Sequence, residues 1–115
     1  MLGNRALFLD RDGVINKDYG YISKVSDIDF VDGIFPLVRY ANELGFLVLI
    51  ITNQAGVAHG YFEKTNFHKL MNWIVDEFKE QSCKIDDYFA CFTHPDAKVP
   101  ELRRLDYRRK PGPGM

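Results

Sequence analysis

Apolar runs alternate with amphipathic stretches along this chain of 115 residues. Three apolar runs, at residues 5–10, 46–51 and 87–93, predict strands, because continuous apolar segments bounded by turn signals are typical of buried strands. Two segments between them, at residues 34–44 and 65–81, carry apolar side chains at helical spacing and predict helices. The first of these has proline in its first turn and glycine at its end, where helices favour them.

The order strand–helix–strand–helix–strand predicts an α/β fold with a parallel sheet. The crossovers between its strands are expected to be right-handed. The carboxyl ends of parallel strands then lie at one edge of the sheet, where ligands of these folds bind. We expect a polar, aromatic loop at residues 16–29 to follow the first strand. The length is that of one small domain, placed at residues 1–115.

Composition and charge exclude several classes of partner. The hydrophobic content of 46% is ordinary for a globular protein, and the formal net charge of −1 gives no field that attracts nucleic acid or membranes. We find no apolar stretch that could span a bilayer and no signal-peptide pattern. Because two cysteines make no disulfide framework, we expect a cytoplasmic protein. From the net charge and the lack of a spanning segment, we expect neither nucleic acid nor a membrane as a partner.

Two carboxylates follow the first predicted strand directly. Asp10 and Asp12 stand one residue apart, and Gly13 allows the backbone to turn away sharply. Two close carboxylates repel each other unless a cation or a shared proton relieves them. They therefore indicate a magnesium site with one aspartate free to act as a nucleophile. The alternative is an acidic turn that caps a helix after a core strand.

Two further clusters could hold a phosphoryl group. Thr52 and Asn53 follow the second strand and offer a hydroxyl and an amide. Arg109 and Lys110 lie near the end of the sequence and offer a forked and a point-like positive charge. The alternatives are that Thr52 caps a helix and that Lys110 is a solvated tail residue.

Together, the segments Asp-Arg-Asp-Gly, Thr-Asn-Gln-x-Gly and Arg-Lys-Pro-x-Pro-Gly-Met resemble the motifs of the haloacid-dehalogenase-like phosphatases. The resemblance covers essentially the whole chain and is greatest to the branch of histidinol-phosphate and heptose-bisphosphate phosphatases. It implies a three-layer, Rossmann-like fold without a cap domain. Four residues match the heptose-bisphosphate phosphatases better: Asn16, Asp18, Gly20 and Tyr21. We expect a small phosphorylated metabolite as substrate, namely heptose 1,7-bisphosphate cleaved at its 7-phosphate, with histidinol phosphate as the alternative.

The resemblance also implies a role for each matching residue. Asp10 would attack phosphorus and form an aspartyl-phosphate, and Asp12 would move the proton. Magnesium would be bound by the Asp10 carboxylate and the Asp12 backbone carbonyl. The phosphoryl oxygens would be held by Thr52, Asn53 and Lys110. The remaining substrate contacts would come from Arg109, Asn16, Asp18, Tyr21, Gln54 and His59, the last standing where the family usually has arginine.

The chain departs from this branch at its zinc loop. The branch usually carries Cys-x-His followed by Cys-x-Cys, but here Thr93 replaces the histidine, and Asp106 and Arg108 replace the two later cysteines. A structural zinc site wants four ligands, mostly cysteine and histidine. We therefore expect no zinc, and we expect Cys91 to be a small buried residue at a strand end.

The chain also lacks a counterpart of the family's fourth, acidic motif, because the sequence given stops at Met115. We expect these residues to be part of a longer protein and to hydrolyse substrate slowly or not at all by themselves. The first strand would then be an open edge through which another chain could associate.

An alternative function of another class is that of a non-catalytic binding or scaffold domain. Its basic tail would bind nucleic acid in a salt-dependent way that Asp10→Asn leaves unchanged.

Overall fold

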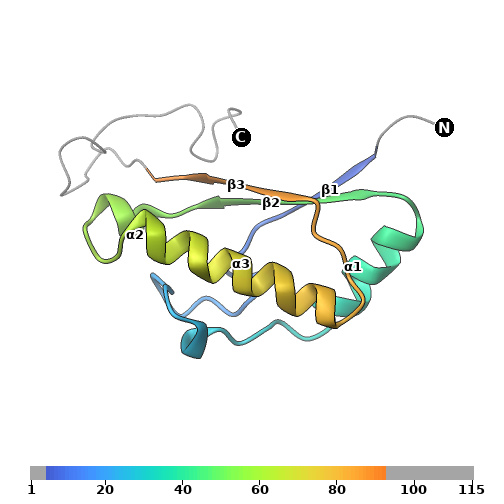
Figure 1. Ribbon diagram of the computed structural model, residues 1–115, viewed down its shortest axis with the longest axis horizontal. Coiled ribbons are helices and arrows are strands. Elements are labelled where there is room, and N and C mark those ends of the chain that lie inside the picture. Colours follow the sequence, from blue (N-terminus) through green and yellow to red (C-terminus); the bar gives the residue numbers. More distant parts are fainter. Residues whose placement is uncertain (1–4, 93–115) are drawn as a thin grey trace.

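The computed structural model describes residues 5–92. They form a parallel sheet in the order β1 (Ala6–Leu9), β2 (Leu47–Asn53) and β3 (Asp87–Cys91) (Figure 1). The register pairs Leu9 with Ile50 and Asn53 with Cys91, so the three carboxyl ends lie at the same edge of the sheet. The predicted α/β fold with a parallel sheet is therefore confirmed. Within the described residues β1 pairs with β2 alone and is one edge of the sheet.

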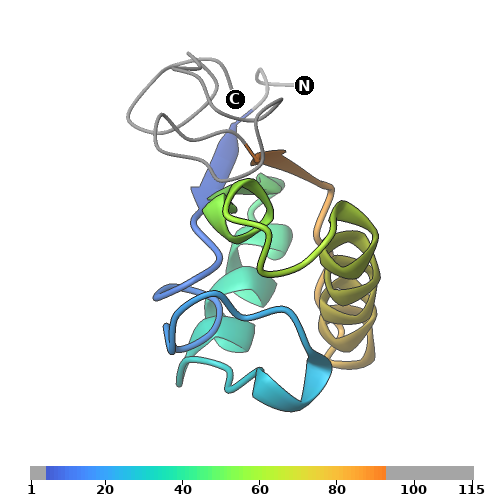
Figure 2. The same ribbon diagram turned by 90° about the vertical axis from the view of Figure 1, so that its left-hand side faces the viewer.

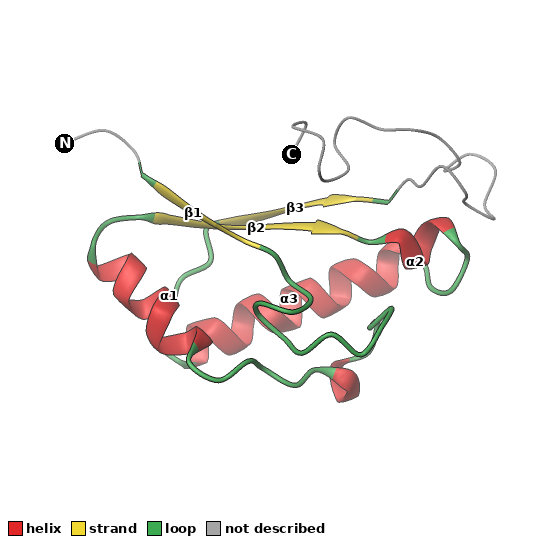
Figure 3. Ribbon diagram, turned by 180° about the vertical axis from the view of Figure 1, so that it is seen from behind, coloured by secondary structure: helices red, strands yellow, loops and turns green. Residues whose placement is uncertain are grey.

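The two long helices lie on the same face of this sheet (Figures 1 and 3). They are α1 (Ile34–Glu43) and α3 (Lys64–Glu80), and each agrees with its predicted range to within one residue at either end. Helix α1 ends where Gly45 adopts φ +80°, a left-handed conformation that glycine tolerates at no steric cost. The apolar spacing in the sequence was therefore sufficient to locate both helices.

The core lies between the sheet and these helices. Val48 and Ile50 of β2 are fully buried, as is the stripe on α3 formed by Phe67, Leu70, Met71, Ile74 and Phe78. The opposite face of the strands carries Phe8, Leu47 and Phe89, which are 56%, 41% and 43% exposed. Among residues 5–92, helices thus cover one face, and the second helical layer of the expected three-layer arrangement does not fall within the described part.

Two local features were not predicted. Strand β2 runs two residues beyond its expected end, because Thr52 and Asn53 pair with Ala90 and Cys91 of β3. The segment after β2 contains the short helix α2 (Ala55–Ala58), which the apolar pattern did not predict. A Cβ atom at Gly56 would collide with the ring of Phe62, which explains why glycine stands in this turn.

The long segment after β1 is tied at its base and packed into the core. Its ends are joined because the Lys17 N–H donates to the Asp29 carbonyl at 2.7 Å and the Val31 N–H to the Ile15 carbonyl at 2.9 Å. It contains the short 3₁₀ helix η1 (Val25–Asp27) and lies on the same side of the sheet as α1 and α3 (Figures 2 and 3). Two of its side chains, those of Ile15 and Ile22, are buried in the core. The segment is therefore a closed loop rather than a loose connection.

Both cysteines are buried thiols, in agreement with the prediction that they form no disulfide. Cys91 is the last residue of β3 and is 1% exposed, as expected of a small apolar residue at a strand end. None of the helices among residues 5–92 combines the length and the apolar character that crossing a membrane requires.

The packing of α3 generates a first prediction. Ile74 is fully buried in the core, so Ile74→Ala removes apolar contacts and leaves a cavity. We expect the free energy of unfolding to fall by about 2–5 kcal/mol, measured by urea denaturation of the intact protein. Asp76→Ala, at an exposed position of the same helix, is the control and should change the free energy by less than about 0.5 kcal/mol. Equal effects of the two changes would contradict this description of the core.

Candidate active site

The side chains that follow β1 alternate between exposed and buried positions. Asp10 is exposed, Arg11 is fully buried and Asp12 is half-buried. A tight turn follows, in which the Arg11 carbonyl accepts hydrogen bonds from the N–H groups of Val14, Ile15 and Asn16. Gly13 has φ +92° in this turn, which an L-residue adopts only with strain. The turn therefore holds Asp10 and Asp12 at the carboxyl end of β1.

The carboxylate of Asp12 accepts hydrogen bonds from three side chains. Arg11 donates from Nε and Nη2 to Oδ1 at 3.1 and 2.9 Å, and from Nη2 to Oδ2 at 3.2 Å. Asn16 Nδ2 donates to Oδ1 at 3.0 Å. Gln54 Nε2 donates to Oδ2 at 3.3 Å. Because these donors come from both sides of the β1 turn and from the end of β2, the position of the carboxylate is set by the fold.

Gln54 also connects the ends of the other two strands. Its Nε2 donates to Thr52 Oγ1 at 2.7 Å, and its backbone N–H donates to the Cys91 carbonyl at 2.8 Å. Thr52 is 1% exposed, and Asn53 is the half-buried last residue of β2. The structure therefore brings Asp12, Thr52 and Gln54 together at one edge of the sheet, as the parallel topology predicts.

The other predicted substrate contacts lie on the loops around this edge. Asn16 is fully buried and donates to Asp12, and Asp18 is exposed and accepts the Gly20 N–H at 3.0 Å. The ring of Tyr21 lies edge-on to those of Tyr61 and His59, with centroids 4.7 and 6.2 Å away. These contacts join the long loop to the segment after α2. The roles of Asn16, Asp18, Tyr21, Gln54 and His59 in substrate binding stay predictions.

Several predicted residues fall outside the described part of the chain. Arg109 and Lys110 do, and so do Thr93, Asp106 and Arg108 of the zinc-loop comparison. The roles predicted for them from the sequence therefore stay predictions.

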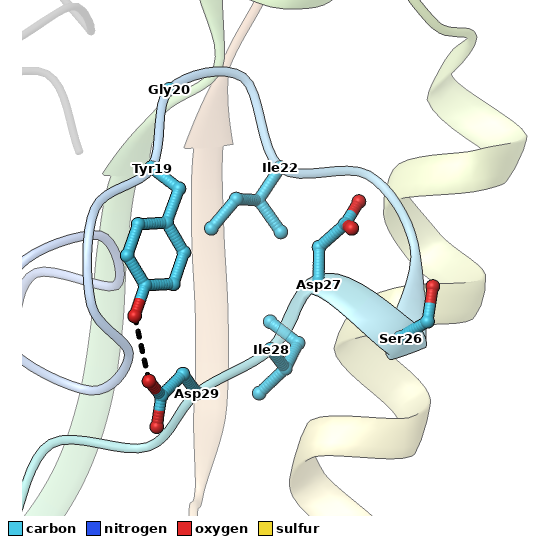
Figure 4. A pocket seen from close by; sticks show the side chains of 7 residues that line it. All are labelled: Tyr19, Gly20, Ile22, Ser26, Asp27, Ile28 and Asp29. Atoms are coloured by element: carbon cyan, nitrogen blue, oxygen red, sulfur yellow. Dashed lines mark hydrogen bonds between the residues drawn. The ribbon is translucent and has the colours of Figure 1, made fainter.

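The long loop carries a small polar network beside a pocket of about 500 Å³ (Figure 4). The Tyr19 hydroxyl donates to Asp29 Oδ2 at 2.7 Å, and Lys17 Nζ lies 3.6 Å from the same oxygen. The hydrogen bond from Tyr19 is the main reason why the pKa of Asp29 is lowered, and the acceptance of that bond by Asp29 raises the pKa of Tyr19. Both groups are exposed, so this network shapes the loop and contributes little to overall stability.

Comparison with known proteins finds relatives that are similar over almost the whole of this chain. No family model matches the chain. A heptose-bisphosphate 7-phosphatase of Burkholderia mallei is 44% identical over 112 residues, 97% of this chain and 59% of the relative. The Escherichia coli K12 enzyme of that kind is 37% identical over 96% of this chain and 58% of its own length. The chain thus spans somewhat less than two thirds of the curated relatives that it matches.

Two solved structures share the arrangement of strands and helices. A protein of Mesorhizobium loti, proposed to be a haloacid-dehalogenase-like phosphatase, superposes with a TM-score of 0.91 at 37% identity, over 97% of this chain and 54% of that one. The chain has the fold of the haloacid-dehalogenase-like superfamily over these residues. A heptose 1,7-bisphosphate phosphatase of B. bronchiseptica, complexed with magnesium and phosphate, superposes with a TM-score of 0.80 at 26% identity, over 96% of this chain and 58% of that one. The resemblance seen in the sequence is therefore confirmed.

The donor atoms at the edge of the sheet suit the magnesium ion expected of this superfamily. Asp10 offers an exposed carboxylate, a hard oxygen ligand of the kind that magnesium prefers. The Asp12 carboxylate is engaged by Arg11, Asn16 and Gln54, which favours its backbone carbonyl as the second ligand. Within residues 5–92 no group of three His, Cys, Asp or Glu side chains is placed to hold a metal ion. The roles of Asp10 and Asp12 in magnesium binding stay predictions.

Arg11 and Tyr61 contact predicted site residues, although neither was predicted from the sequence. Arg11 has no motif role in the resemblance, yet it is fully buried beside Asp12. A signal was present, since Leu7, Leu9 and Arg11 continue one alternation that places them toward the helices. Tyr61 had no local signal, because its contact with Tyr21 depends on how two distant loops meet.

The loop network yields a prediction about proton binding. Tyr19→Phe removes the main cause of the lowered pKa of Asp29, so we expect this pKa to rise toward the ordinary value of an aspartate. The Tyr19 bond stabilises the fold above the ordinary pKa of aspartate and is lost as the pH falls through the lowered value. A pH titration of the Asp29 carboxyl carbon by NMR measures the change. Tyr40→Phe, which alters an exposed tyrosine of α1, is the control and should leave this pKa unchanged.

Proposed function

We propose that the protein is a magnesium-dependent phosphatase that hydrolyses the 7-phosphate of a heptose 1,7-bisphosphate. The relatives from Burkholderia mallei and Escherichia coli carry the names of enzymes for this reaction. The B. bronchiseptica enzyme, which has the same fold over this chain, binds magnesium and phosphate. Because the chain spans about 59% of the Burkholderia relative, the proposal concerns the activity of the whole protein.

One observation carries the proposal. Gln54 bonds to both Asp12 and Thr52, and thereby connects the acidic end of β1 to the hydroxyl at the end of β2. A phosphoryl group bound at this edge would meet carboxylates on one side and hydrogen-bond donors on the other. This is the arrangement that phosphoryl transfer needs, because positioning and charge stabilisation supply almost all of its catalysis.

The first chemical step would be a transfer to the protein. An Asp10 carboxylate oxygen forms a bond to phosphorus while the bond from phosphorus to the sugar oxygen breaks. The electron pair of that bond stays on the sugar oxygen, which takes a proton from Asp12. The sugar leaves as an alcohol, and Asp10 carries the phosphoryl group as an acyl phosphate.

The second step would restore the protein. Asp12, now ionised, takes a proton from water as the water oxygen attacks phosphorus, and the bond to Asp10 breaks to release inorganic phosphate. Thr52, Asn53 and Lys110 would hold the phosphoryl oxygens throughout, and Arg109 would bind the far end of the substrate. Bound by the Asp10 carboxylate and the Asp12 carbonyl, magnesium supplies positive charge that offsets the charge of the phosphoryl oxygens.

Loss of the nucleophile tests the reaction. We expect Asp10→Asn to lower magnesium-dependent phosphate release by the intact protein by about 10³-fold or more, because an amide cannot form the phosphoenzyme. Chelation of the metal should have a similar effect that added magnesium reverses. Asp76→Asn, on an exposed part of α3, is the matched control and should retain activity. Full activity of Asp10→Asn would refute the proposal, and salt-dependent nucleic-acid binding by both forms would favour the binding domain instead.

A comparison of two substrates tests the sugar specificity. We expect kcat/KM to be at least about tenfold higher for heptose 1,7-bisphosphate than for histidinol phosphate, because a site built to bond a substrate's polar groups discriminates against a substrate that lacks them. Phosphate release from each compound at matched concentrations gives this ratio. A higher value for histidinol phosphate would reverse the assignment of substrate while leaving the phosphatase chemistry intact.

A further inference from the structure

Arg11 stands between the two aspartates in the sequence. Its side chain is fully buried, whereas Asp10 is exposed and Asp12 is half-buried. Burying an arginine without partners is costly, so a buried guanidinium is retained where it is paired and hydrogen-bonded. Arg11 is not among the residues to which the family motifs assign chemistry, and its role must be found from its contacts.

These contacts point toward Asp12 rather than toward the substrate. Nε and Nη2 of Arg11 form a two-donor fork on the Asp12 carboxylate, with distances of 2.9 to 3.2 Å. A planar fork of this kind fixes the plane of a carboxylate as well as its distance, which a single ammonium cannot do. Nη2 also donates to the Ile22 carbonyl at 3.1 Å. The same guanidinium therefore connects Asp12 to the long loop that surrounds the site.

The arginine is itself held in place by the core. Its Cζ lies 5.8 Å from the centroid of the Phe67 ring, and Phe67 is a fully buried residue of α3. A cation over an aromatic face is attracted to the ring, most strongly where water is absent. Nη1 is buried and has no hydrogen-bond partner among the described residues. Arg11 thus contacts both Phe67 of α3 and the carboxylate of Asp12, and connects the two.

We propose that Arg11 is a positioning residue, which acts through Asp12 and orients its carboxylate for proton transfer to the leaving oxygen. This inference rests on the proposed phosphatase function and deepens it. Arg11 is too deeply buried to touch the substrate, so it is not a catalytic residue. The requirement for proton transfer differs among leaving groups, and this difference separates positioning of Asp12 from a merely structural role.

The experiment compares two phosphate esters of similar size in the intact protein. Benzyl phosphate has a poor leaving group that needs a proton, whereas 4-nitrophenyl phosphate releases a stable anion without one. The measured quantity is the ratio of their kcat/KM values, which reports on the first chemical step and does not depend on the fraction of protein that is folded. Arg11→Lys keeps the charge and the apolar stem but removes the fork. Arg11→Met, the second variant, also removes the charge.

We expect Arg11→Lys to lower kcat/KM for benzyl phosphate by about 10- to 100-fold, and that for 4-nitrophenyl phosphate by less than about threefold. Arg11→Met should shift the ratio at least as far. Arg39→Lys is the matched control, because Arg39 also donates to a carbonyl, that of Gln81 at 2.6 Å, but contacts neither aspartate. It should leave the ratio unchanged.

Other results would overturn the inference. An equal loss on both esters would assign Arg11 a structural role only, and unchanged values for both would show that the fork is dispensable. A parent protein that hydrolyses neither ester and no heptose bisphosphate would refute the proposed function, and this inference with it. A parent with normal activity and an unaltered ratio in the Arg11 variants would refute this inference alone.

Discussion

The carboxylate of Asp12 is the point at which the fold and the site depend on each other. Its bonds to Arg11, Asn16 and Gln54 bring together the turn after β1 and the end of β2. A buried guanidinium needs such an acceptor, and a half-buried carboxylate needs such donors. The buried charge of Arg11 is therefore paired with Asp12, the same carboxylate that would transfer the proton. Removal of any partner would disturb the stability of the turn and the geometry of the site together.

Parallel topology supplies the rest of the site at little further cost. Because β1, β2 and β3 run in the same direction, the residues that follow them lie at one edge of the sheet. The Gln54 N–H bonds the Cys91 carbonyl and so fixes the end of β2 against that of β3. Helices α1 and α3 stabilise this arrangement from the face that they cover, through the core around Val48 and Ile50.

Much of this arrangement could be predicted from the sequence, because it follows from local periodicity. The apolar runs located three strands, the stripe on α3 located its buried face, and the strand ends placed Asp12 near Thr52. The end of β2 was misplaced because Thr52 and Asn53 are polar and join the sheet only through pairing with β3. Helix α2 was missed because four residues are too few to show a helical period.

Tyr61 was not predicted because its partner lies far away in the chain. The ring of Tyr21 meets that of Tyr61 across two loops, and no local pattern encodes that distance. Arg11 was overlooked for a different reason, since charged residues are expected at the surface and its acceptors include the remote carbonyl of Ile22. The local sequence pattern therefore predicts the strands and helices, whereas the burial of a polar side chain depends on contacts between distant loops.

The closed base of the long loop separates two kinds of evolutionary change. Lys17 and Asp29 are joined by a backbone hydrogen bond, so insertions and replacements between Lys24 and Asp29 can remodel the pocket there without altering the path of the chain at Asp12. The Ile22 carbonyl is the exception, because Arg11 holds it. The outer half of the loop could thus change in sequence while the turn that holds Asp12 is inherited unchanged, provided that this one carbonyl stays where it is.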